Sequence, residues 1–87
     1  MADGVEDNPE LPLERRTRYL IEVMNCNRIQ RDDFATVYML KRITTQSPEE
    51  VGFSPLVREA VADLLKREKP MWRQDLRAVA QHIGMTA

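Results

Sequence analysis

Apolar residues recur at helical spacing in four segments of the chain, and no segment alternates between apolar and polar residues for long enough to predict a strand. The clearest stripe comprises Val57, Ala60, Val61, Leu64 and Leu65. It follows Ser54-Pro55, and serine before proline is typical of a helix start, because the hydroxyl caps a free amide and proline suits the first turn. We predict a helix from Pro55 to about Lys69, ended by Pro70.

Two further helices are predicted before this one. The first runs from Leu13 to about Cys26 and leaves through Asn25–Asn27, because asparagine tolerates the left-handed conformation at a helix end. Its apolar arc holds Leu13, Tyr19, Leu20, Ile21, Val23 and Met24. The second runs from Asp33 to Thr44, with Asp32 as its N-cap.

The second helix is apolar around most of its circumference. The residues responsible are Phe34, Val37, Tyr38, Met39, Leu40 and Ile43. Only Ala35 and Arg42 mark an exposed strip. A helix with so little polar surface is typical of the centre of a bundle, so we place it between the other helices.

Two shorter signals complete the fold. Ser47-Pro48-Glu49-Glu50 has the spacing of a capping box and predicts about one helical turn, which Gly52 ends. A last helix is expected from about Met71 to Ile83, with Gly84 as its C-terminal cap and one stripe made of Trp72, Leu76, Val79, Ala80 and Ile83. The prediction is an all-α fold: a compact, orthogonal four-helix bundle plus one short helical turn, over residues 13–87.

The first twelve residues differ in composition from the rest. They contain Asp3, Glu6, Asp7 and Glu10, with no basic residue and with two prolines. Such a segment has little apolar surface to offset the entropy of ordering. We predict a disordered acidic tail over residues 1–12.

Composition narrows the classes of partner and compartment. Thirteen basic and fourteen acidic residues give a net charge of −1, which argues against a dominant nucleic-acid surface. The single cysteine cannot form an internal disulfide, so an intracellular location, cytoplasmic or nuclear, is expected. No apolar run approaches the roughly 18 residues that a membrane span needs, so no membrane partner is expected.

Residues with catalytic or ligand chemistry are sparse. Cys26 and His82 form the only conceivable nucleophile–base pair, and no third residue is marked to orient the base. Asp32 and Asp33 are explained by helix capping, and the three glycines form no phosphate-binding loop. We therefore expect no enzymatic activity, no cofactor and no metal site.

The function that remains is protein–protein interaction, as a small adaptor, regulator or complex subunit, with self-association also open. The candidate partner-binding residues are Phe53, Met71 and Trp72, extended by Tyr38. Aromatic side chains near helix ends are frequent anchors of interfaces. Trp72 has a second interpretation as a core residue, because it lies on the same stripe as Leu76 and Val79.

A DNA-binding or transcription-regulating role is the alternative. Residues 76–86, LRAVAQHIGMT, resemble the first helix and turn of a helix-turn-helix unit, whose recognition helix would lie after Ala87. Five arginines surround the first helix: Arg15, Arg16, Arg18, Arg28 and Arg31. Nucleic acid is nevertheless the disfavoured partner because of the overall charge balance.

Overall fold

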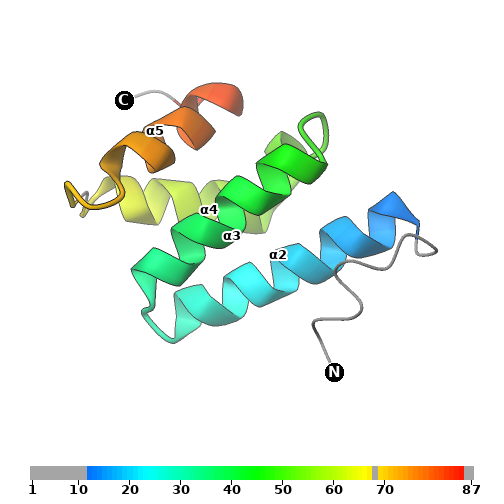
Figure 1. Cartoon of the computed structure of the whole chain (residues 1–87), viewed down its shortest axis with the longest axis horizontal. Helices are drawn as coiled ribbons and strands as arrows, with labels where there is room; N and C mark the ends of the chain where they lie inside the picture. The colour runs from blue at the N-terminus through cyan, green and yellow to red at the C-terminus, as the bar shows by residue number, and fades with distance from the viewer. Residues whose placement is uncertain (1–11, 68, 86–87) are drawn as a thin grey trace.

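All regular elements in the described part of the chain are helical (Figure 1). The computed structural model describes residues 12–67 and 69–85. Its elements are α2 (Leu13–Ile29), α3 (Asp33–Gln46), a 3-10 turn η1 (Val51–Phe53), α4 (Pro55–Leu65) and α5 (Arg73–His82). The predicted all-α fold of four helices plus one short turn is confirmed.

The predicted acidic tail falls almost entirely on residues 1–11, which lie outside the described residues. Pro12 is described and is the N-cap of α2. Its carbonyl accepts hydrogen bonds from the amides of Arg15 and Arg16, at 3.0 and 3.1 Å. The helix therefore begins at Pro12 without help from a capping side chain.

α2 continues beyond the exit predicted at Asn25–Asn27. The chain leaves it through Arg31, whose φ of 64° lies in the left-handed region. The amide of Asp32 bonds to the carbonyl of Asn27, and the amide of Arg31 bonds to that of Arg28, both at 3.0 Å. This pair of bonds is the Schellman motif, which glycine usually closes. An arginine in that position is strained, because its Cβ crowds the following carbonyl.

The start of α3 follows the sequence prediction. The Asp32 carboxylate accepts a hydrogen bond from the amide of Ala35 at 3.1 Å, so the predicted N-cap is confirmed. The helix runs two residues past the predicted end at Thr44. The Thr44 hydroxyl donates to the carbonyl of Leu40, which lets a β-branched polar residue stay within the helix.

Ser47 has a tertiary partner that the capping-box pattern did not predict. It is buried, and its hydroxyl hydrogen-bonds to the buried hydroxyl of Thr17 on α2. The amides of Glu50 and Val51 bond to the Ser47 carbonyl and shape the turn into η1. The hydroxyl thus joins two helices, and η1 begins without a side-chain cap.

The second serine–proline pair acts as predicted. Ser54 accepts a hydrogen bond from the amide of Val57 at 3.3 Å, and Pro55 is the first residue of α4. α4 ends at Leu65, about one turn earlier than predicted, and a turn follows at Lys66 and Arg67. α5 begins two residues later than predicted, with Trp72 as its N-cap.

The C-terminal end of α5 has the same motif as the end of α2. Gly84 has a φ of 78°, and its amide bonds to the carbonyl of Gln81 at 3.2 Å. The amide of Met85 bonds to the carbonyl of Ala80 at 2.7 Å. The predicted glycine cap is confirmed. Unlike Arg31, Gly84 adopts the left-handed conformation without strain.

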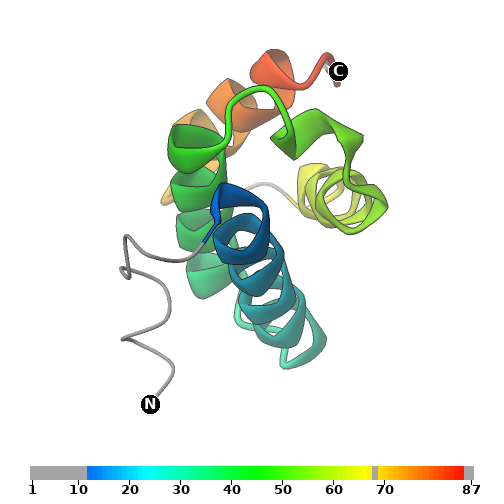
Figure 2. The same cartoon turned by 90° about the vertical axis from the view of Figure 1, so that its right-hand side faces the viewer.

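α3 is the central helix, as predicted. It packs along α2, and it also contacts α4 and α5. Figure 2 shows α4 nearly end-on while α3 runs down the view, so the helices cross rather than run side by side as in an up-and-down bundle. The buried core takes residues from every element: Leu20, Met24, Val37, Met39, Leu40, Ile43, Val51, Val57, Ala60, Val61, Leu64, Trp72, Leu76, Val79, Ala80 and Ile83.

The exposed strip of α3 is not the predicted one. Phe34 and Tyr38 are 61% and 53% exposed, whereas Ala35 and Arg42 are half-buried. The neighbours of α3 cover Val37 and the rest of its apolar surface but leave the stripe of Phe34 and Tyr38 open. The expectation that apolar residues are buried around most of the helix was therefore wrong for these two aromatic residues.

The side chains of Arg58 and His82 hold the far end of α5 against the turn before α4. Arg58 donates from Nη1 to the carbonyls of Gly52 at 3.1 Å and Ile83 at 3.3 Å. The ring nitrogen Nε2 of His82 lies 2.6 Å from the carbonyl oxygen of Pro48. The end of α5 is thereby fixed on η1, on the side of the molecule away from the α2–α3 turn.

We expect Leu64→Ala to destabilise the fold by about 2–5 kcal/mol, because it leaves a cavity in a fully packed site. The same change at Leu65, which is only half-buried, serves as the matched control and should cost less. Urea denaturation followed by circular dichroism measures both. Equal losses at the two positions would show that Leu64 is not the packing residue.

We expect Arg31→Gly to be more stable than Arg31→Ala by about 0.5–1 kcal/mol. Both variants remove the side chain, but only glycine adopts the positive φ freely, and its greater freedom in the unfolded state offsets part of the gain. Thermal unfolding of the two variants beside the parent chain measures the difference. An alanine variant as stable as the glycine variant would contradict a left-handed Arg31.

Candidate functional site

The structure does not bring the four predicted binding residues together. Phe53 lies in η1, before α4, and is 85% exposed. Met71 lies beyond the other end of α4 and is 73% exposed. Tyr38 lies on α3 with about half of its surface open. Phe53 and Met71 are therefore two separate exposed positions, as their places at opposite ends of one helix require.

Trp72 is a core residue. It is only 3% exposed, so it is not the open anchor that one interpretation of the sequence required. The second interpretation describes its position: Trp72, Leu76 and Val79 follow one another at helical spacing and are all buried. The physical reason is that α5 packs on α3 and α4, and Trp72 at its N-cap lies on the same buried stripe.

An edge of Trp72 nevertheless helps to line a small surface hollow between α3 and α5, here called the anchor hollow. Its volume is about 80 Å³. Its lining residues are Phe34, Val37, Tyr38, Lys41, Trp72 and Asp75. Lys41 and Asp75 form an ion pair across the two helices at 3.3 Å. The hollow is therefore mainly aromatic and apolar, with one paired charge of each sign beside it.

Phe34 is the functional candidate that the sequence analysis missed. The apolar pattern placed it in the core, yet it is exposed and lines the anchor hollow. A signal was present in the sequence: Lys41 and Thr45 continue the stripe of Phe34 and Tyr38 at helical spacing. A stripe that becomes polar after two aromatic residues is typical of a surface, and the number of apolar residues on the helix obscured it.

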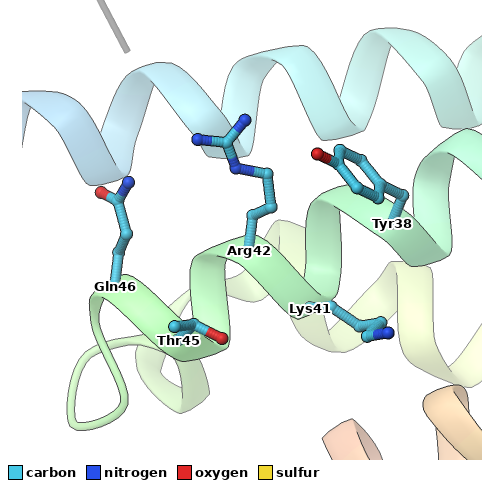
Figure 3. Close-up of a pocket in the computed structure, with 5 residues that line it drawn as sticks. All are labelled: Tyr38, Lys41, Arg42, Thr45 and Gln46. Carbon is cyan, nitrogen blue, oxygen red and sulfur yellow. The ribbon is translucent and has the colours of Figure 1, made fainter. Parts of the chain in front are cut away.

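A second, shallower hollow flanks α3 on its other side (Figure 3). It has a volume of about 320 Å³ and is lined by Tyr38, Lys41, Arg42, Thr45 and Gln46. In Figure 3, Arg42 and Gln46 extend toward α2, while Lys41 points away from them. Tyr38 and Lys41 also line the anchor hollow, so they form a ridge between the two depressions.

Ion pairs join three helices near the α2–α3 turn. Arg67 makes a bidentate contact with Asp33, with Nε to Oδ2 at 3.0 Å and Nη2 to Oδ1 at 2.9 Å. It also contacts Asp63 at 3.2 Å, and Arg28 lies 3.8 Å from the same carboxylate. The ends of α2 and α4 and the start of α3 therefore meet at one place. Phe34 and Trp72, at the starts of α3 and α5, share the anchor hollow beside it.

We call this region the connection end, because it contains both the α2–α3 turn at residues 30–32 and the described residues of the α4–α5 connection, 66–67 and 69–72. Both lie at the left of the view in Figure 1. Its carboxylates Asp33 and Asp63 are occupied by Arg67. The hydrogen bonds from Arg67 lower the pKa of Asp33, and they outweigh the opposing effect of its burial. The same contacts raise the pKa of Arg67.

Four cations at the connection end have no such partner. Arg31, Lys66, Lys69 and Arg73 are exposed, and none forms a direct ion pair within the described part of the chain; Arg31 and Lys69 attract the Asp33 carboxylate only from farther away. Of the acidic residues beside them, Asp32 caps α3, and residue 68 is outside the described residues. The exposed, unpaired charge among the described side chains here is thus mainly positive.

Cys26 and His82 are not brought together. Cys26 is exposed in the last turn of α2, near the connection end. His82 contacts Pro48, just after the other end of α3. The 14 residues of α3 span roughly 20 Å between these places. Among the described residues, no group of three or more potential ligands could hold a metal ion. The expected lack of enzymatic activity stays a prediction.

The helix-turn-helix interpretation also remains a prediction. α5 and the left-handed Gly84 have the local form of a first helix and its turn, and the described residues include no helix after them. The five arginines around α2 do not form one free surface: Arg15 and Arg18 are exposed, whereas Arg28 pairs with Glu59 and Asp63.

No helix in the described ranges is both long and apolar enough to span a bilayer.

Comparison with known proteins provides no relative from which a function could be transferred. No protein-family model matches the chain, and no curated protein and no solved structure matches it significantly.

The Asp33–Arg67 pair makes stability depend on acidic pH. Because the folded state lowers the Asp33 pKa, the pair stabilises the fold above the carboxyl's ordinary value of 3.8 and is lost as pH falls through the lower folded value. We expect Asp33→Asn to cost roughly 1–2 kcal/mol near neutral pH and progressively less below about pH 4. Asp32→Asn is the control, because asparagine caps a helix as well as aspartate. Urea unfolding at several pH values measures both; a pH-independent cost at Asp33 would contradict this pairing.

Proposed function

We propose that this protein is a small, non-catalytic interaction module that binds another protein through the α3–α5 face at the connection end. The anchor hollow carries this proposal. Phe34 and Tyr38 are exposed aromatic residues that line it, and the exposed Met71 directly precedes Trp72, which lines it too. Interfaces concentrate their binding energy on aromatic and methionine contacts that fill such depressions.

Exposure of these side chains favours a partner over a purely structural role. Phe34 and Met71 leave most of their apolar surface in water, although burial of a side chain of this size contributes about 1.5–3 kcal/mol. Tyr38 adds an apolar ring with a polar tip, a combination enriched at interfaces. Phe34 and Tyr38 line the same hollow, so one partner side chain can contact both of them.

The hollow is also well supported from behind. Its floor comprises Val37 and Trp72, which are both 3% exposed and belong to the core. The Lys41–Asp75 ion pair joins the two helices that form its walls. A surface held in this way loses little conformational entropy on binding.

The free thiol of Cys26 is compatible with a reducing, intracellular compartment for such a module.

The test compares matched aromatic and apolar variants at the two ends of the molecule. Phe34→Ser and Met71→Ser should abolish capture of the partner from a lysate of the source cells, because they remove the exposed apolar contacts at the hollow. Phe53→Ser, at a residue 85% exposed beyond the other end of α4, should retain it. Quantitative mass spectrometry of the captured proteins provides the measurement, and circular dichroism checks that each variant is folded.

Two results would contradict the proposed surface. Capture that is lost with Phe53→Ser and kept with Phe34→Ser would move the binding site to η1. Light scattering tests for a second copy as the partner: a dimer mass for the parent chain that becomes a monomer mass in Phe34→Ser would make self-association the function of the face.

A further inference from the structure

We infer, on the basis of that proposed function, that the partner presents an acidic peptide segment with one apolar side chain, which enters the anchor hollow while its carboxylates meet the cations of the connection end. Two independent features of the surface point to this chemistry. One is the sign of its unpaired charges, and the other is the size and lining of the hollow.

The charge argument starts from the ion pairs. At the connection end, Arg67 and Arg28 contact Asp33 and Asp63, so these two cations and two carboxylates offset one another within the fold. Lys69 and Arg73 have no such partner in the described ranges, and they flank Met71 and Trp72 in the sequence. Arg31 and Lys66 add two more exposed cations on the neighbouring connections. Carboxylates of a partner would complement these charges and speed its encounter with the surface.

The count of charges along the chain also favours an acidic partner for the helical part. All four acidic residues of the first twelve positions lie before the helical part, which leaves thirteen basic and ten acidic residues in positions 13–87. The helical part therefore has an excess of three positive charges, although the full chain has a net charge of −1.

The hollow indicates how such a segment would be anchored. Its volume of about 80 Å³ is far below that of a pocket for a drug-sized molecule, so it suits a single apolar side chain. Phe34, Tyr38 and Trp72 provide apolar walls for that group. The Lys41–Asp75 pair at its side offers a charge of each sign to the peptide backbone or a neighbouring polar group.

A peptide fits these features better than the other common polyanions. Neutralising a long phosphate backbone uses many cations, whereas the four found here suffice for the few carboxylates of a short segment. A bilayer surface presents no single side chain for a small hollow between two helices. The combination of one anchoring depression with a few surrounding cations is typical of short-segment recognition.

The experiment selects peptides with the full chain as bait, from a displayed library of random 16-residue sequences. We expect enrichment of sequences that combine several Asp or Glu residues with a Leu, Ile, Val or Met. The most enriched peptide is then synthesised with a fluorescent label, and its affinity is measured by anisotropy. The double variant Lys69→Glu with Arg73→Glu should weaken binding about tenfold or more, and added salt should weaken binding to the parent chain.

The matched control is Arg15→Glu with Arg18→Glu, which changes the net charge equally but lies at the start of α2, away from the connection end. It should leave the affinity nearly unchanged. If this control weakens binding as much as the Lys69 and Arg73 variant, the effect comes from overall charge, and the inferred site is wrong.

The remaining outcomes separate the inference from the proposed function. Enriched peptides that are neutral or basic, and whose binding is lost with Phe34→Ser, would overturn the acidic partner and leave the interaction surface standing. If none of the enriched peptides depends on Phe34 for binding, that result contradicts both the acidic partner and the proposed interaction surface. Binding of duplex DNA, or of phosphatidylserine vesicles, that is lost with the Lys69 and Arg73 variant while no peptide is enriched would overturn the peptide in favour of that polyanion.

Discussion

Burial of one side of α3 by three other helices is the interaction on which the rest of the structure depends. Leu40 and Ile43 are completely buried, and α2, α4 and α5 all contact the helix that carries them. A chain this small buries only roughly 60–70% of the surface that its unfolded form exposes, so it does not cover every face of its central helix. The stripe left uncovered is that of Phe34 and Tyr38, so the candidate surface results from the same packing that makes the core.

Local chemistry could be predicted from the sequence where one residue determines one backbone contact. Asp32 and Ser54 cap the helices that follow them, and Gly84 takes the positive φ at the end of α5. Each of these signals acts within four residues, so no knowledge of the fold is needed to interpret it. The four helices and their order follow from the same signals together with the apolar spacing.

The remaining features depend on contacts between segments distant in sequence. Ser47 resembles a local cap, but its hydroxyl pairs with Thr17, 30 residues earlier in the chain. Trp72 resembles a possible anchor, but α5 turns it onto the core. The anchor hollow exists only because α3 and α5 lie together, and the unpaired state of Lys69 and Arg73 depends on which carboxylates Arg67 occupies. Single-sequence periodicity contains none of this information.

The buried hydroxyl pair of Thr17 and Ser47 has a consequence for how α2 and α3 align. The two residues lie near the start of one helix and just after the end of the other, and their hydroxyls are partners within an otherwise largely apolar core. Sliding α2 along α3 by one helical turn would separate them by about 5.4 Å. Each hydroxyl would then be buried without a partner, at a cost of roughly 1–3 kcal/mol. The pair therefore selects one register from the several that interchangeable aliphatic side chains would allow.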